Sequence, residues 1–245
     1  MQTKLVMKTL VIAVLFISLA NNAAQGQLIK LPKFFTKDTV SKLTENEAGQ
    51  GIKEALSKGV VTAVLHLNKT DGFFGSDIYK LLLPPDAKKV ENTLRKMGMN
   101  AQVDKAILQI NRGAEDAVGF ATDIFMDAIR QMTINDAINI VKGPKDAATQ
   151  YFKQKTTNQL IAAFSPSVKS SLDKTDATKY YGNIVNTYNN IPFTQDVNPD
   201  LTSYVVGKAV DALFDQVAKE ELNIRSNPLA RTSDILKKVF GSMIR

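Results

Sequence analysis

Apolar residues recur at spacings of three and four along most of the chain, which is the period of an α-helix with one buried face. The first clear series spans residues 52–67. A longer series over residues 103–128 predicts one long helix or two collinear ones, with a bend at Gly119 because glycine weakens a helix interior. A third series, over residues 206–224, predicts the most clearly amphipathic helix of the chain.

Capping residues divide these series into separate helices. Pro84-Pro85-Asp86 predicts a helix start, and Gly98 predicts the end of that helix, whose buried side includes Met97. Thr133 followed by Asp136 is a capping-box variant. Further starts are predicted at Thr156 with Gln159, at Ser165 before Pro166, at Asn198 before Pro199 and near Thr232 or Ser233.

Alternation of period two is almost absent, so the sequence does not predict a sheet. The expected fold is all-α: a single-domain multi-helix bundle with short capped helices and at most a minor extended segment near residues 78–83. The helical domain is expected to span residues 45–245, and residues 27–44 are expected to form a mobile N-terminal segment.

The first 26 residues differ from the rest. Lys4 and Lys8 precede the apolar run "TLVIAVLFISLA", and small residues precede a cleavage site between Gly26 and Gln27. Twelve helical residues span about 18 Å, which is short of a hydrocarbon core of about 30 Å. The sequence therefore predicts a signal peptide over residues 1–26 and a periplasmic location for the mature chain.

The residue types available limit the chemistry. The chain has no cysteine, which excludes disulfides and thiolate sites, and His66 is its single histidine. His66 could serve as a general base or metal ligand, but we interpret it as a partly buried residue at a helix end. No acidic cluster has the spacing of a metal site, and no glycine-rich loop follows a strand. We therefore predict no catalytic, cofactor-binding or metal-binding residue and no cofactor.

One group of charged residues stands out as a candidate polar site. Asp127 falls in the last turn of a predicted helix, where the helix dipole disfavours a negative charge, so a cation is expected nearby. Arg130 is the local candidate, and Arg225 or Arg231 would be a tertiary one. Asp136 completes the group, which an enzyme that works through carboxylates and arginine would use.

The net charge of the whole chain is +7, and basic residues are concentrated in residues 225–245. This segment could bind an anionic envelope surface, or it could be a docking helix with solvated lysines. No aromatic residues alternate with the basic ones, so no nucleic-acid partner is expected.

Several long motifs carry a family resemblance: "DAIRQMTINDAINIVKGPKDAATQYF", "KTDGFFG", "NPDLTSYV" and "IRSNPLARTSDILKKVFG". With them, the chain from about Gly51 to Gly241 resembles the bacterial family called domain of unknown function 4197. The resemblance implies an exported, helical protein of Gram-negative bacteria. It supplies no established activity and no catalytic residues.

The leading functional hypothesis is a non-enzymatic periplasmic protein that binds an envelope component or a small ligand, with no transmembrane span in the mature chain. The lack of a nucleophile, base or metal constellation is its motivation. The alternatives are an enzyme based on carboxylates and arginine, and a binder of anionic envelope surfaces through the basic C-terminal helix.

Overall fold

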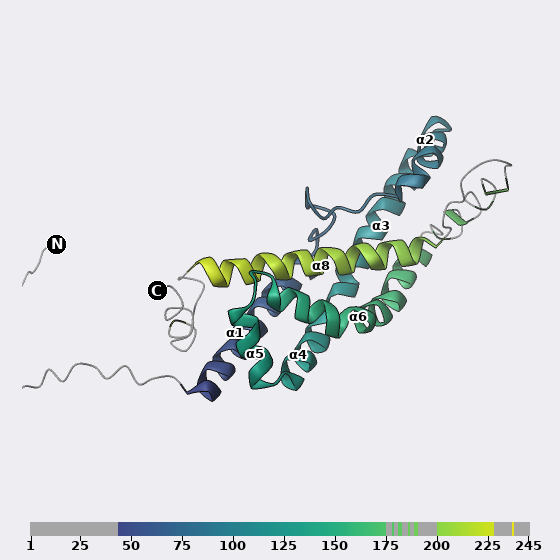
Figure 1. Ribbon diagram of the computed structural model, residues 1–245. Coiled ribbons are helices and arrows are strands. Elements are labelled where there is room, and N and C mark those ends of the chain that lie inside the picture. Colours follow the sequence, from purple (N-terminus) through teal and green to yellow (C-terminus); the bar gives the residue numbers. More distant parts are fainter. Residues whose placement is uncertain are drawn as a thin grey trace, which may run out of the picture. The chain divides into compact units, whose positions relative to one another are not determined.

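The computed structural model describes residues 44–174 and 200–227, and singly residues 178, 181, 182, 186, 189, 190 and 237. Over the two continuous ranges the regular structure is helical: α1 (Glu45–Asn68), the 3-10 turn η1 (Pro85–Ala87), α2 (Lys88–Lys96), α3 (Asn100–Val118), α4 (Ala121–Gln131), α5 (Ile134–Lys142), α6 (Ala147–Asp173) and α8 (Leu201–Ser226) (Figure 1). The predicted all-α bundle is confirmed. The predicted signal peptide, the segment up to residue 43 and, apart from Lys237, the predicted final helix lie outside the described residues.

The core lies where the longest helices meet. α3 packs on α6, α6 packs on α8, and α8 packs on α1. At the centre, Phe125 of α4, Phe152 of α6 and Phe214 of α8 stack edge to face, with ring centroids 5.1 Å apart for the first two and 6.1 Å apart for Phe125 and Phe214. Burial of apolar surface of this kind is the dominant stabilising term in a bundle without disulfides.

The long apolar series over residues 103–128 forms two helices, and the break lies at Gly119. The side-chain amide of Asn68 donates to the carbonyl of Glu115 at 2.7 Å, which takes the acceptor that the amide of Gly119 would use in a continuous helix. Gly119 instead donates to Asp116, at 3.3 Å. A Cβ atom at Gly119 would lie 2.9 Å from the Asn68 amide nitrogen, so glycine permits this close approach.

Two predicted helix starts are wrong, because α6 runs straight through both. Thr156 is buried inside α6 and its hydroxyl donates to the carbonyl of Phe152 at 2.7 Å. The hydroxyl of Ser165 donates in the same way to Ile161, and Pro166 lies within the helix. A continuous buried face outweighs the local capping signals; it comprises Phe152, Leu160, Phe164, Val168 and Leu172.

Other predicted helix ends are confirmed or shifted slightly. Thr133 and Asp136 form the capping box of α5. Gly98 follows α2 with φ +82°, but Met97 beside it is 69% exposed, so its predicted burial is wrong. Asp200 caps α8 by accepting from the amide of Ser203 at 3.0 Å, so the start lies two residues after Asn198, which is itself outside the described residues.

Candidate functional site

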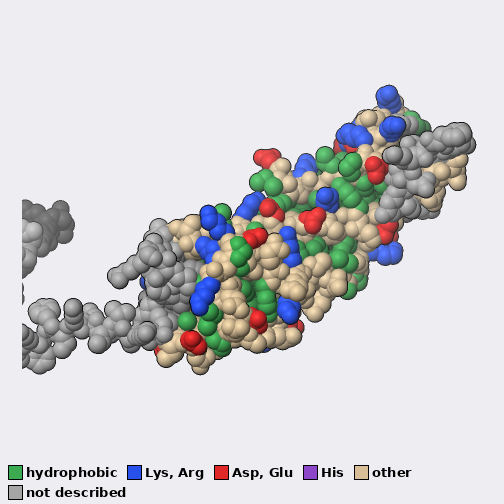
Figure 2. All heavy atoms as spheres, viewed as in Figure 1, with side chains coloured by type: hydrophobic (Ala, Val, Ile, Leu, Met, Phe, Trp, Pro, Cys, Tyr) green, Lys and Arg blue, Asp and Glu red, His purple; other side chains and the backbone are tan. Residues whose placement is uncertain are grey.

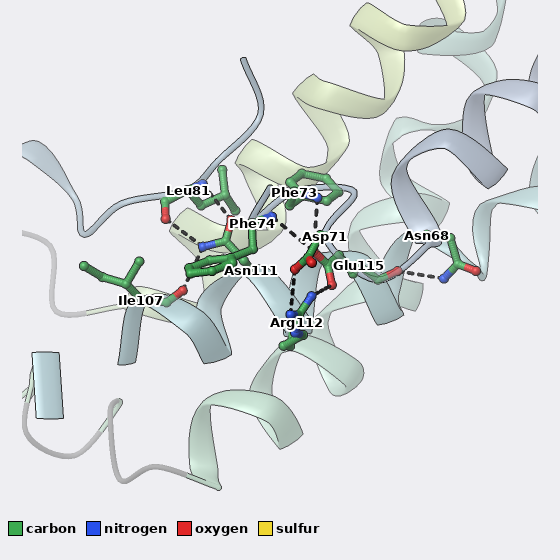
Figure 3. Close-up of polar contacts among 9 residues, drawn as sticks. All are labelled: Asn68, Asp71, Phe73, Phe74, Leu81, Ile107, Asn111, Arg112 and Glu115. Carbon is green, nitrogen blue, oxygen red and sulfur yellow. Dashed lines mark hydrogen bonds and ion pairs between the residues drawn. The ribbon is translucent and has the colours of Figure 1, made fainter. Parts of the chain in front are cut away.

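The segment between α1 and α2 is fixed to α3 by two buried polar side chains, Asn111 and Glu115 (Figure 3). Both lie on one face of α3, one turn apart. Neither was singled out by the sequence, although their spacing of four beside the apolar series was a usable signal. The segment approaches from 30 to 42 positions earlier in the chain, and this tertiary pairing cannot be read from local pattern.

Glu115 holds the beginning of the segment. Its Oε1 accepts from the amides of Phe73 and Phe74, both at 3.1 Å, and its Oε2 accepts from Arg112 at 2.5 Å. Arg112 also pairs with Asp71 at 2.7 Å, and these two acids raise the pKa of its guanidinium. Because each oxygen of the buried carboxylate has a donor, the charge is compensated and the turn is held in one position.

Asn111 holds the middle of the segment. Its side-chain Oδ1 accepts from the amide of Leu81 and its Nδ2 donates to the carbonyl of Leu81, both at 2.8 Å, while Nδ2 also donates to Ile107 at 2.7 Å. One asparagine thus gives Leu81 the two bonds that a neighbouring strand would provide. Residues 80–82 have no helical or turn structure. Of the segment expected to be extended, residues 78 and 79 belong to a turn, and residues 80–82 are irregular chain held by α3.

Tyr79 joins the same segment to α8. Its hydroxyl donates to Asp215 at 2.7 Å and accepts from Lys219 at 2.7 Å, and Lys219 pairs with Asp215 at 2.9 Å. Burial raises the pKa of the Tyr79 phenol, and the hydrogen bond from Lys219 lowers the pKa of Asp215. The phenol is therefore not activated as a base, and its role is to attach the segment to α8.

A groove of about 670 Å³ lies between this pinned segment, α2 and α8. Its lining is mostly apolar and includes Leu81, Leu83, Tyr204 and Ala212. Ile78 and Leu82 also line it, and their side chains are 73% and 50% exposed. Figure 2 shows hydrophobic side chains gathered on this face between α8 and α2, with charged side chains around them.

Charged side chains border the groove on α8 and α2. Glu91 of α2 is paired with Lys88 at 3.3 Å and with Arg95 at 2.9 Å. On α8, Lys208 and Asp211 are exposed and have no side-chain partner among the residues that the structure describes. On α8 the groove therefore offers one charge of each sign without an ion-pair partner among the described residues, three positions apart. Lys80 of the pinned segment adds a second cation to the lining, with its ammonium 4.3 Å from the centroid of the Phe74 ring.

The predicted polar site is brought together in part. Arg130 pairs with Asp127, as the local candidate was expected to do, and both side chains are more than half exposed. Asp127 and Asp136 line one hollow of about 280 Å³, with Tyr151 and Lys155 of α6 as members that the sequence did not suggest. Arg225 is not part of this hollow, and Arg231 lies outside the described residues.

Near neutral pH, two groups of the hollow each keep one protonation state: Asp136 is ionised and Tyr151 is protonated. The hydrogen bonds of the capping box, from the hydroxyl and amide of Thr133, lower the pKa of Asp136 below its ordinary value. Burial raises the pKa of Tyr151 above its ordinary value. Neither group is tuned toward the neutral range in which a general acid or base works best.

Arg225 and Glu221 of α8 form a buried pair that joins two helix ends. Arg225 donates to the carbonyls of Ile140 and Val141 at the end of α5. Glu221 accepts from the amides of Ala148 and Thr149 at the start of α6, at 3.0 and 2.9 Å. The positive charge of Arg225 thus lies at the negative end of the α5 dipole, and the negative charge of Glu221 lies at the positive end of the α6 dipole. Both placements are electrostatically favourable. This contact accounts for Arg225, which the sequence offered as an alternative, tertiary partner of Asp127.

The remaining sequence candidate, His66, is exposed in the last turn of α1, so its interpretation as a partly buried, bonded residue is wrong. Within the described ranges, no three His, Asp or Glu side chains gather as a metal site would require. Among the same residues, no helix has the length and apolar character needed to cross a membrane.

No curated protein and no solved structure matches the chain. A family model does match, over residues 42–241, and it covers all the helices described above. The chain therefore belongs to the family described as protein of unknown function, DUF4197.

Proposed function

We propose that this protein is a non-enzymatic binding protein of the Gram-negative periplasm, and that it holds an envelope partner in the groove between residues 78–85 and α8. The leader-like residues 1–26 motivate export. The observation that supports the binding role is the pair of exposed apolar side chains, Ile78 and Leu82, on the rim of an apolar groove.

The walls of the groove are held firmly, which favours recognition. Asn111 and Glu115 fix the segment to α3, and Tyr79 fixes it to α8. A surface that is already ordered loses little conformational entropy when a partner binds. Ile78 and Leu82 are therefore presented in a constant arrangement, although water surrounds much of each side chain.

The two alternative functions have weaker support. In the hollow of Asp127 and Asp136, the pKa of Asp136 is lowered and that of Tyr151 is raised, so neither of these two groups is tuned for proton transfer near neutral pH. Of the basic C-terminal residues, Arg225 is engaged with Glu221 and two helix carbonyls, so it is not available to an anionic surface.

Thermal unfolding of the mature chain with a panel of envelope components tests the proposal. The panel contains phospholipid micelles, cell-wall fragments, periplasmic metabolites and linear peptides. A true ligand at about 100 times its Kd stabilises the native state by about 2.7 kcal/mol, which raises the midpoint. The double variant Ile78→Ser and Leu82→Ser is expected to lose the shift.

The matched control is the double variant Leu65→Ser and Leu222→Ser. These side chains are 63% and 48% exposed, close to the 73% and 50% of Ile78 and Leu82, but they lie outside the groove. The control should keep the full shift. A shift that both double variants retain would contradict the proposed site.

A further inference from the structure

We propose that the occupant of the groove is an extended peptide segment of a partner protein, which pairs its backbone with Leu82. This inference rests on the proposed function and specifies its ligand. It begins from two neighbouring residues: the fold uses both main-chain groups of Leu81, and it leaves those of Leu82 without a partner among the described residues.

On the inner side, the backbone of Leu81 is fully bonded. Its amide and carbonyl both meet the side chain of Asn111 at 2.8 Å, and its own side chain is 7% exposed. The preceding residue, Lys80, donates its amide to Ser76 at 3.1 Å. These bonds fix both the position and the rotation of the segment.

On the outer side, the backbone of Leu82 is unused. In a planar trans peptide the carbonyl of one residue and the amide of the next point in opposite directions. The carbonyl of Leu81 meets Asn111, so the amide of Leu82 points away from Asn111. Neither its amide nor its carbonyl has a hydrogen-bond partner within the described part of the chain. Pro84, with φ −50° and ψ 145°, continues the extended course and has no amide to offer, which limits the pairing to a short stretch.

The chemistry of this edge selects a peptide over a lipid chain. An exposed amide and carbonyl on one residue are complemented by the amide and carbonyl of a second extended chain, as in strand addition. An acyl chain has neither group. The side chains of Ile78 and Leu82 offer apolar contacts beside this edge, since they are 73% and 50% exposed.

The opposite wall of the groove is also suited to a peptide. Lys208 and Asp211 are exposed, unpaired among the described residues and of opposite sign. A peptide can carry both a basic and an acidic side chain and so complement both charges, whereas an anionic lipid headgroup would complement Lys208 alone and leave Asp211 without a partner. We therefore assign the groove to a peptide that has apolar side chains and also carries one acidic and one basic side chain.

The test is a selection from a random library of linear seven-residue peptides displayed on phage, with the mature protein as target. The best peptide is synthesised and its Kd is measured by fluorescence anisotropy. Leu82→Pro removes the main-chain amide hydrogen. Leu82→Val is its control, because valine keeps that hydrogen and has a side chain of about the same size as proline. We expect Leu82→Pro to bind at least about tenfold more weakly than Leu82→Val, since a lost hydrogen bond and the proline ring both oppose pairing.

Methylation of each peptide amide in turn gives a second readout. Pairing predicts that methylation weakens binding at one position above all, that of the peptide amide that donates to the carbonyl of Leu82. Equal Kd values for Leu82→Pro and Leu82→Val, together with no single sensitive position, would overturn the inference. So would a dimer of this chain that Leu82→Pro dissociates, since the occupant would then be a second copy.

The outcome also separates this inference from the function on which it rests. If Ile78→Ser with Leu82→Ser abolishes binding of an envelope lipid, while no peptide is selected, the groove is a binding site and the peptide assignment is wrong. If binding of every selected peptide survives the serine substitutions, both are wrong.

Discussion

Asn111 is a fully buried asparagine whose three hydrogen bonds connect α3 to Leu81 and to its own helix. Its replacement would leave the amide and carbonyl of Leu81 buried without partners. The sequence predicted the apolar neighbours of Asn111 but not its role, because Leu81 lies 30 positions away. By contrast, the sequence did predict Arg130 as the partner of Asp127, since that pair spans three residues within one helix.

Asn111→Ala is expected to reduce the free energy of unfolding by about 2–4 kcal/mol, because each unsatisfied buried group costs about 1–3 kcal/mol. Urea unfolding followed by circular dichroism measures the change. The control, Asn92→Ala, alters an exposed asparagine of α2 and should stay within about 0.5 kcal/mol of wild type. Similar midpoints for the two variants would show that Asn111 does not hold the segment.

At the scale of elements, local capping signals predicted the start of a helix correctly where the helix begins with its own cap. They predicted false starts where the packing of a buried face determines how far a helix continues. The capping box of Thr133 and Asp136 begins α5 as predicted. Thr156 and Ser165 resemble caps, but the buried face of α6 continues through both of them. The start of α6 has no cap from Asp146, because Glu221 of α8 supplies the acceptor from 72 positions away.

Glu221→Ala is expected to destabilise the fold by about 3 kcal/mol or more, because it removes the carboxylate beside Arg225 and leaves the buried amides of Ala148 and Thr149 without their acceptor. The side chains of this pair are 6% and 16% exposed. Glu54→Ala breaks an exposed pair with Lys58 and should cost less than about 1 kcal/mol. Thermal unfolding of the two variants checks the difference, and equal midpoints would contradict a role for Glu221 at the α5–α6 turn.

The capping box also predicts a pH dependence. The pKa of Asp136 is lowered in the folded chain from 3.8, chiefly by the Thr133 hydroxyl. Its stabilising contribution is therefore present above that value and is lost as the pH falls through the folded pKa. Asp136→Asn should be less stable than wild type at pH 7, and the urea midpoints of the two proteins should converge as the pH falls from 3.8 through the lowered pKa of Asp136. A constant difference over this range would argue against the ionised cap.

For the molecule as a whole, the periodicity of apolar residues was sufficient to predict a helical bundle. It was not sufficient to predict the groove. The groove exists because an irregular segment, a short helix and α8 meet, and each contact between them is tertiary. The sequence predicted at most a minor extended segment near residues 78–83. It could not show that Ile78 and Leu82 remain exposed after the bundle has formed.

Export of the protein to the periplasm is a prediction about the molecule as a whole. When the chain is expressed in a Gram-negative host, the protein in the periplasmic fraction is expected to begin at Gln27, because the signal peptide is removed after Gly26. Mass spectrometry of the intact protein measures the start. A chain that keeps residues 1–26 and stays in the cytoplasm would contradict the proposed location.

The most direct measurement of the central claim is photo-crosslinking in intact cells. A benzophenone side chain is placed at position 82, on the rim of the groove, or at position 222, which is comparably exposed on α8 outside it. If the groove holds an envelope partner, illumination gives a discrete covalent adduct from position 82 and none from position 222. Adducts of equal yield from both positions, or an adduct from position 222 alone, would contradict the account.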